Sequence, residues 1–229
     1  MPPSTLPIFP LGVVLFPGTP QPLHIFEPRY RQMLADCLEG DRRFGISFMS
    51  GEDPEVPEPP VAAIGCVALI EQVWPLPDGR SNLLAVGETR YVVQEFIETD
   101  RLYRIARVEP FDDEPWDDTA ILERLADDLR DEFRRFATAL GALTDKPLAP
   151  MNLPEDPAAL SFHVAASIDV EMPIKQELLE SQSPQERVTR LTTLLESVTG
   201  DVAQRAQIHQ RAKRNGRGTT DDGSALKGR

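Results

Sequence analysis

The hydrophobic pattern changes its period near residue 112, and this change limits the folds open to the chain. Before it, short runs rich in β-branched and aromatic residues are separated by Gly, Pro, Asp and Asn, which is typical of strands joined by turns. After it, apolar residues recur every three or four positions, as on the buried face of a helix. The sequence therefore predicts an α+β chain in which a β-rich part precedes an α-helical part.

Three segments are expected from this pattern. A β-rich domain with one helix covers residues 1–112, an α-helical domain covers residues 113–213, and a disordered basic tail covers residues 214–229. The helix of the first domain begins at Pro28, which suits a first helical position because it has no N–H to leave unpaired, and it ends before Gly40. Seven stretches are predicted as strands: residues 7–16, 22–26, 44–49, 61–73, 82–87, 91–97 and 103–108.

Helix signals recur through the second part. A stripe of apolar residues predicts a helix over residues 122–140 that ends at Gly141. Asp156 is expected to cap a second helix, and Pro173 to open a third. Ser183 begins a capping box with a glutamate three residues later, so a last helix is expected to fill the rest of the α-helical domain.

The charge distribution along the chain limits the classes of molecule that it is expected to bind. The net charge is -13, and the residues from Gly200 onward carry seven Lys or Arg against three Asp, so the preceding part holds -17. Nucleic-acid binding depends on neutralising phosphates, and so acidic a body argues against it. The acids at residues 112–118 lack the ligand pattern of a calcium loop and indicate a solvated linker. Without a membrane-length apolar run or a signal segment, a cytoplasmic protein with no membrane contact is expected.

The sequence offers no supported catalytic or metal site. His24 lies between strand residues without a neighbouring nucleophile, and His163 and Ser167 lie four apart on one helix without an acid to orient the imidazole. The histidines lack metal-site spacing, and Cys37 and Cys66 lie within apolar patterns typical of buried thiols. No catalytic residue, metal or cofactor is therefore expected.

Three blocks of sequence carry a family pattern. Residues 6–31 read LPIFPLGVVLFPGTPQPLHIFEPRYR, and residues 64–93 read IGCVALIEQVWPLPDGRSNLLAVGETRYVV. Residues 153–196 read LPEDPAALSFHVAASIDVEMPIKQELLESQSPQERVTRLTTLLE. Together they resemble the N-terminal substrate-binding domain of Lon, the ATP-dependent protease, in its small stand-alone form. The resemblance implies a PUA-like β-pseudobarrel followed by an α-helical bundle.

The resemblance also implies a protein-binding module that is not an enzyme. Full-length Lon adds an ATPase module and a Ser-Lys protease module, but this chain has no G-x-x-x-x-G-K-[ST] motif, and none of its lysines is expected to be desolvated enough for a Ser-Lys dyad. Expected partners are unfolded or apolar protein segments, with a protease or chaperone as a further candidate, in protein quality control. A monomer or weak dimer is expected. A PUA-like RNA-binding protein is the alternative, and a small hydrolase is the third hypothesis.

The first block supplies the candidate binding residues. Its six prolines hold the segment extended and withhold hydrogen-bond donors, which suits an edge strand or an irregular strand. Apolar surface expected around Leu11, Phe16 and Pro17 is the candidate peptide-binding site. The barrel core is expected to include Ile8, Val13, Leu15 and Phe26.

A structural junction is expected at three charged residues, Glu27, Arg29 and Arg90. Charges so close to apolar segments need partners before they need substrates. One form of the junction is a buried carboxylate held by an arginine fork, and the other is a fork to backbone carbonyls. We interpret these residues as architectural rather than ligand-binding.

Overall fold

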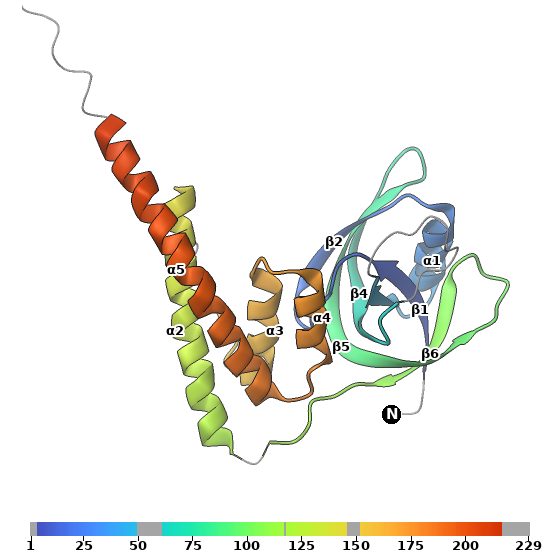
Figure 1. The fold of residues 1–229 in the computed structure, drawn as a ribbon. Coiled ribbons are helices and arrows are strands. Elements are labelled where there is room, and N and C mark those ends of the chain that lie inside the picture. The colour runs from blue at the N-terminus through green and yellow to red at the C-terminus, as the bar shows by residue number, and fades with distance from the viewer. Residues whose placement is uncertain (1–3, 50–60, 117, 146–151, 217–229) are drawn as a thin grey trace, which may run out of the picture.

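The chain folds into a β-barrel followed by a set of helices, as the computed structural model shows for residues 4–49, 61–116, 118–145 and 152–216 (Figure 1). The strands are β1 (Ser4–Leu11), β2 (Pro20–Ile25), β3 (Arg43–Phe48), β4 (Ile64–Pro75), β5 (Ser81–Ile97) and β6 (Arg104–Pro110). The helices are α1 (Pro28–Glu39), α2 (Thr119–Thr144), α3 (Pro157–Ser167), α4 (Met172–Glu180) and α5 (Pro184–Gly216). The predicted α+β fold is confirmed. Of the expected disordered tail, residues 217–229 lie outside the described ranges, whereas α5 includes Gly216.

One sheet forms the barrel. Its strand order is β2-β5-β4-β3-β1-β6, and β6 pairs back onto β5, which closes the sheet on itself. β1 and β3 are parallel, and the other pairs are antiparallel. Closure through β6 leaves β2 bonded to β5 alone among the described strands, so the second edge of β2 is free.

β5 is longer than the pattern predicts. Two strands are expected at residues 82–87 and 91–97, whereas the structure has one strand of 17 residues. The polar residues between them stay extended because their side chains find partners: Glu88 accepts two hydrogen bonds from Arg43. The single long strand allows β5 to pair with β2, β4 and β6.

Local signals set where the later helices begin, but not where α2 ends. The Asp156 side chain accepts a hydrogen bond from Ala159 N at 2.7 Å, and Ser183 Oγ accepts one from the N–H three residues later, so both predicted caps are confirmed. The predicted end at Gly141 is wrong, because α2 continues to Thr144 and is closed by Asp145 at φ 55°. α2 and α5 pack along each other and extend away from the barrel (Figure 1).

The connection between β1 and β2 joins two cores. One core lies inside the barrel beneath α1, and the other lies among α2, α3, α4 and α5. Leu15 belongs to the barrel core, whereas Val14 and Phe16 belong to the helical core. Gly87 permits this crossing, because a Cβ there would lie 2.2 Å from the carbonyl oxygen of Phe16. Since the two parts share apolar contacts, a domain boundary at residue 112 stays a prediction.

Candidate functional site

The N-terminal segment with the predicted binding residues is divided between surface and core. Leu11 and Pro17 are half-buried and remain candidates. Phe16 is fully buried, and its ring centroid lies 6.1 Å from that of Phe162 on α3. The prediction that Phe16 forms part of an exposed surface is therefore wrong, because the segment crosses from the barrel to the helices at this point.

Phe26 takes the opposite position. It was expected in the barrel core but is 57% exposed, and its ring stacks on that of His24 with centroids 5.9 Å apart. Side chains alternate along β2, so Ile25 faces the barrel core while its neighbours face outward. The assignments of Phe16 and Phe26 are thus reversed relative to the expectation.

The free edge of β2 presents mainly hydrogen-bond acceptors. In the antiparallel register with β5, the two prolines of β2 occupy positions whose backbone groups point away from β5, where their missing N–H leaves no ladder bond unmade. This outer edge therefore offers the carbonyls of Pro20, Pro22 and His24 but only the N–H of His24. The Pro22 carbonyl also accepts a hydrogen bond from the exposed side chain of Gln21 at 3.1 Å, and its second lone pair stays open to a peptide. An extended peptide that donates its N–H groups can pair here, whereas the shortage of donors disfavours pairing between two copies of this edge.

A cleft of about 410 Å³ opens beside the start of β2. It lies between the β1–β2 connection on one side and α3 and α4 on the other, and its volume falls in the range of ligand pockets. Val13 and Met172 contribute apolar wall, and Ser167 and Lys175 contribute polar groups. None of the described residues that line the cleft is acidic, although the chain as a whole is strongly acidic.

The geometry of the histidines gives no support to a hydrolytic site. Ser167 Oγ donates to the backbone carbonyl of His163 at 2.8 Å, and the His163 ring packs edge-on against Phe133. The imidazole is therefore not placed as a base for that hydroxyl. His24 instead lies on the outer face of β2, where its Nδ1 is 2.7 Å from Asn82 Oδ1.

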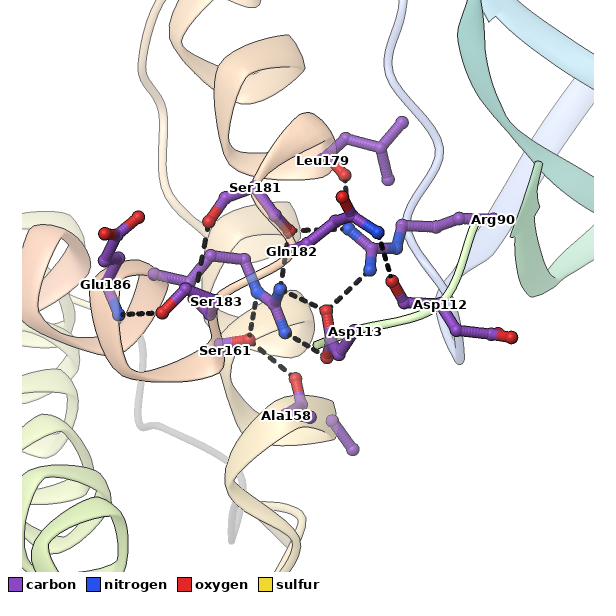
Figure 2. A network of polar contacts seen from close by, with 12 residues as sticks. Arg90, Asp112, Asp113, Ala158, Ser161, Leu179, Ser181, Gln182, Ser183 and Glu186 are labelled. Carbon is purple, nitrogen blue, oxygen red and sulfur yellow. Dashed lines mark hydrogen bonds and ion pairs between the residues drawn. The ribbon is translucent and has the colours of Figure 1, made fainter. Parts of the chain in front are cut away.

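Arg90 forms a junction, but not with its predicted partners. Glu27 and Arg29 pair with each other at the surface, at 2.8 Å. Arg90 is buried where β5 meets the helices, and it donates to the carbonyl oxygens of Leu179 and Ser181 at 2.7 and 2.6 Å (Figure 2). A single junction of all three predicted residues is therefore wrong, and the fork to backbone carbonyls describes part of what Arg90 does.

Asp113 is the shared carboxylate of a buried network (Figure 2). Arg187 donates to both of its oxygens at 2.6 and 2.8 Å, and Arg90 donates to Oδ1. Arg187 also donates to Ser161 Oγ at 3.0 Å and to Ser181 O at 2.8 Å. The side chain of Arg90 is only 3% exposed, and that of Arg187 is 0% exposed. Two arginines share one carboxylate, so one positive charge is left without a full counter-charge. The carbonyls at the C-terminal end of α4, where the helix dipole is negative, stabilise this remaining positive charge.

This network positions one wall of the cleft. The guanidinium of Arg187 lies over the ring of Phe162 at 4.2 Å, and that of Arg90 lies over the same ring at 5.2 Å. Burial lowers the pKa of Arg90, while the Asp113 carboxylate opposes that shift. The contacts tie β5 to α3, α4 and α5, and α3 and α4 supply the helical wall of the cleft.

Sequence reasoning missed Asp113 and Arg187. Asp113 lies in a run of acids that is typical of a solvated linker, and nothing local distinguishes it from its neighbours. Arg187 lies four residues before Leu191, on the apolar face of the last helix. That position was a signal of burial, because a charged residue within an apolar stripe must find a partner inside.

Three further properties concern metals, thiols and membranes. Within the described ranges, no group of three or more His, Cys, Asp or Glu side chains could hold a metal ion. Burial raises the pKa of Cys37 to about 12 and also raises that of Cys66, so both thiols stay protonated at neutral pH. The helices of the described part of the chain are all too short or too polar to cross a membrane.

Comparison of this sequence with models of protein families and with known proteins points to a single family. The model of the ATP-dependent protease La (LON) substrate-binding domain matches residues 5–197. The Lon protease of Cytophaga hutchinsonii is 25% identical over 210 residues, which cover 90% of this chain and 26% of the relative. Lon protease 2 of Thermus thermophilus is 28% identical over 220 residues, which cover 92% and 26%. The chain thus spans about a quarter of the length of the curated relatives it matches.

Comparison with solved structures gives the same fold. A Lon N-terminal domain protein from Xanthomonas campestris superposes with a TM-score of 0.58 at 24% identity, covering 83% of this chain and 98% of that one. The N-terminal domain of a Mycobacterium avium complex Lon protease superposes with a TM-score of 0.63 at 17% identity, covering 84% and 98%. The barrel and helices described above therefore have the fold of Lon N-terminal domains.

Proposed function

Because the chain belongs to the ATP-dependent protease La (LON) substrate-binding domain family, we propose that it binds extended apolar segments of other proteins and has no catalytic activity of its own. The observation that carries this proposal is the free, acceptor-rich edge of β2 beside a partly apolar cleft. A bound segment pairs its N–H groups with the edge and places side chains in the cleft, with Leu11 and Pro17 as further contacts. So small a surface binds weakly, with a Kd on the order of micromolar.

We place this binding in protein quality control. Unfolded and partly folded proteins expose apolar segments, so a surface of this kind selects them over folded proteins. The captured segment passes to a protease or chaperone in the cytoplasm, and the binding protein is a monomer or weak dimer. The parts of Lon protease outside the matched region would supply ATP hydrolysis and peptide cleavage.

RNA binding is the less favoured alternative. The net charge of -13 repels phosphates, and the candidate cleft has one lysine among its lining residues rather than a basic patch. Tight, salt-sensitive binding of structured RNA in a fluorescence titration would reverse this order.

Replacing His24 with proline is expected to weaken capture of an extended apolar peptide by about five- to tenfold, because it removes the one N–H that the outer edge of β2 offers. An exposed edge strand tolerates proline, so the barrel should stay folded. Fluorescence anisotropy of a labelled apolar peptide measures the affinity, and a thermal melt followed by circular dichroism checks the fold.

His24→Ala is the matched control. It removes the imidazole, with its contacts to Asn82 and Phe26, but keeps the backbone N–H, so its affinity should stay within about twofold of the original. Equal affinity for the proline variant and the original protein would contradict pairing at β2. A loss with alanine as large as with proline would assign the effect to the side chain.

The purified protein is expected to hydrolyse neither ATP nor casein. The sequence lacks a nucleotide cradle, and the described serines show no activated arrangement with a lysine or histidine. Phosphate release and fluorescent casein assays measure this, with heat-denatured protein as the background. Turnover above that background, retained through a second purification step, would contradict the non-catalytic proposal.

A further inference from the structure

Lys175 lies in the wall of the cleft, and it is a cation without a paired carboxylate in the described part of the chain. Its Nζ donates to the backbone carbonyl of Ala166 at 3.2 Å, near the C-terminal end of α3. Among the described residues, no carboxylate oxygen lies within ion-pair distance of Nζ, and Asp169 acts on it only at longer range. An ammonium group has three donors, so this one retains donors for a ligand.

The surroundings of Lys175 favour an anion with an apolar body. The side chain is half-buried, and burial lowers its pKa. Val13, Val14 and Met172 lie in the same cleft, and none of the described residues that line it is acidic. A carboxylate placed against Nζ would restore the interactions that a partly desolvated ammonium group lacks, and the apolar walls would hold the adjoining side chain.

The path of β2 indicates which carboxylate fits. Pro20 and Gln21 line the cleft, whereas the rest of β2 leads away from it. A peptide paired with the outer edge in the antiparallel direction therefore runs toward the cleft and reaches it with its C-terminal end. The three outward carbonyls of β2 accept N–H groups from its last residues.

We propose that the cleft binds the C-terminal carboxylate of an extended apolar polypeptide, with Lys175 as the counter-ion and the outer edge of β2 as the pairing strand. The inference rests on the proposed capture of apolar segments and narrows it to segments at the end of a chain. Lys175 thus discriminates chain ends from internal segments of the same composition. Its contact with Ala166 holds the ammonium group toward the cleft instead of leaving it in solvent.

The test compares three labelled apolar peptides of eight residues on the unaltered protein, and the first two have the same sequence. The first has a free C-terminal carboxylate, the second has a C-terminal amide, and the third has the amide together with an internal glutamate. The first should bind about tenfold more tightly than the second, because a charge-assisted hydrogen bond is lost with the amide. The third should bind as weakly as the second.

Variants at the cleft complete the test. Lys175→Met should bind the carboxylate and amide peptides equally, at the level of the amide on the original protein, whereas Lys175→Arg should keep a preference. Arg124→Met on α2 removes an exposed positive charge elsewhere and should leave the tenfold preference unchanged. A thermal melt of each variant shows whether the fold is intact, and the peptide comparison on the original protein needs no variant.

Each outcome has a separate meaning. Equal binding of the carboxylate and amide peptides would overturn the chain-end inference while leaving capture of apolar segments in place. Tight binding of the third peptide would assign the cleft to acidic side chains and also overturn it. Failure of all three peptides to bind at millimolar concentration would overturn the proposed function and the inference together.

Discussion

Replacing Asp113 with alanine is expected to lower the free energy of unfolding by about 3–5 kcal/mol, the cost of removing one partner from a buried ion pair. Arg90 and Arg187 would then remain buried without the carboxylate that both share. The carbonyls of Leu179 and Ser181 would still accept hydrogen bonds, but they carry no full charge to balance two guanidinium groups. Urea denaturation followed by circular dichroism measures the change.

Asp112→Ala is the matched control for this prediction. Asp112 is exposed, and its contact with Gln182 is made through its backbone carbonyl, so truncating the side chain should cost less than about 0.5 kcal/mol. Asp113→Asn should fall between the two, because the amide keeps one acceptor oxygen and loses the charge. A loss below about 1 kcal/mol for Asp113→Ala would mean that water or a neighbouring carboxylate replaces it, and that the network is not what fixes the helices to the barrel.

The starts of the helices could be predicted because the chemistry that sets them is local. Pro28 lies at the first position of α1, and the Asp156 and Ser183 side chains accept hydrogen bonds from N–H groups three residues later. Each signal lies within four residues of the structure it determines. The end of α2 was not predictable in the same way, because packing against α5 carries the helix through Gly141.

The junction could not be predicted from the sequence, because its partners are distant. Arg90 bonds to the carbonyl of Leu179, 89 residues away, and Arg187 bonds to Asp113, 74 residues away. The sequence indicated that Arg90 needs a partner, but the carboxylate of the predicted junction, Glu27, pairs with Arg29 instead. Local charge patterns therefore show that a residue needs a partner without showing which one it finds.

The free edge of β2 was partly predictable. The prolines indicated an edge strand or an irregular strand, and the structure has β2 at the open end of the strand order. The cleft was not predictable, because its two walls come from the β1–β2 connection and from α3 and α4, roughly 150 residues later in the chain. The proposed role of Lys175 depends on both walls, so the sequence alone could not indicate it.

Phe16→Ala is expected to lower the free energy of unfolding by about 3–5 kcal/mol, because it removes a fully buried ring from the core that the barrel connection shares with the helices. The cavity would lie against Phe162, which also carries the two guanidinium groups of the network. The surrounding elements are held by that network and by the close approach at Gly87, so they can collapse only partly into the space.

Phe26→Ala is the matched control, since it makes the same change ten residues later on an exposed ring. Its expected cost is below about 0.5 kcal/mol, because the residue is 57% exposed and its ring stacks on His24 at the surface instead of filling the core. Urea denaturation gives the loss in the free energy of unfolding for each variant, and the larger loss shows which phenylalanine supports the core. Similar losses for both variants, or a larger loss for Phe26→Ala, would contradict the crossing of the segment from barrel to helices at Phe16. They would also return Phe16 to the list of candidate peptide contacts.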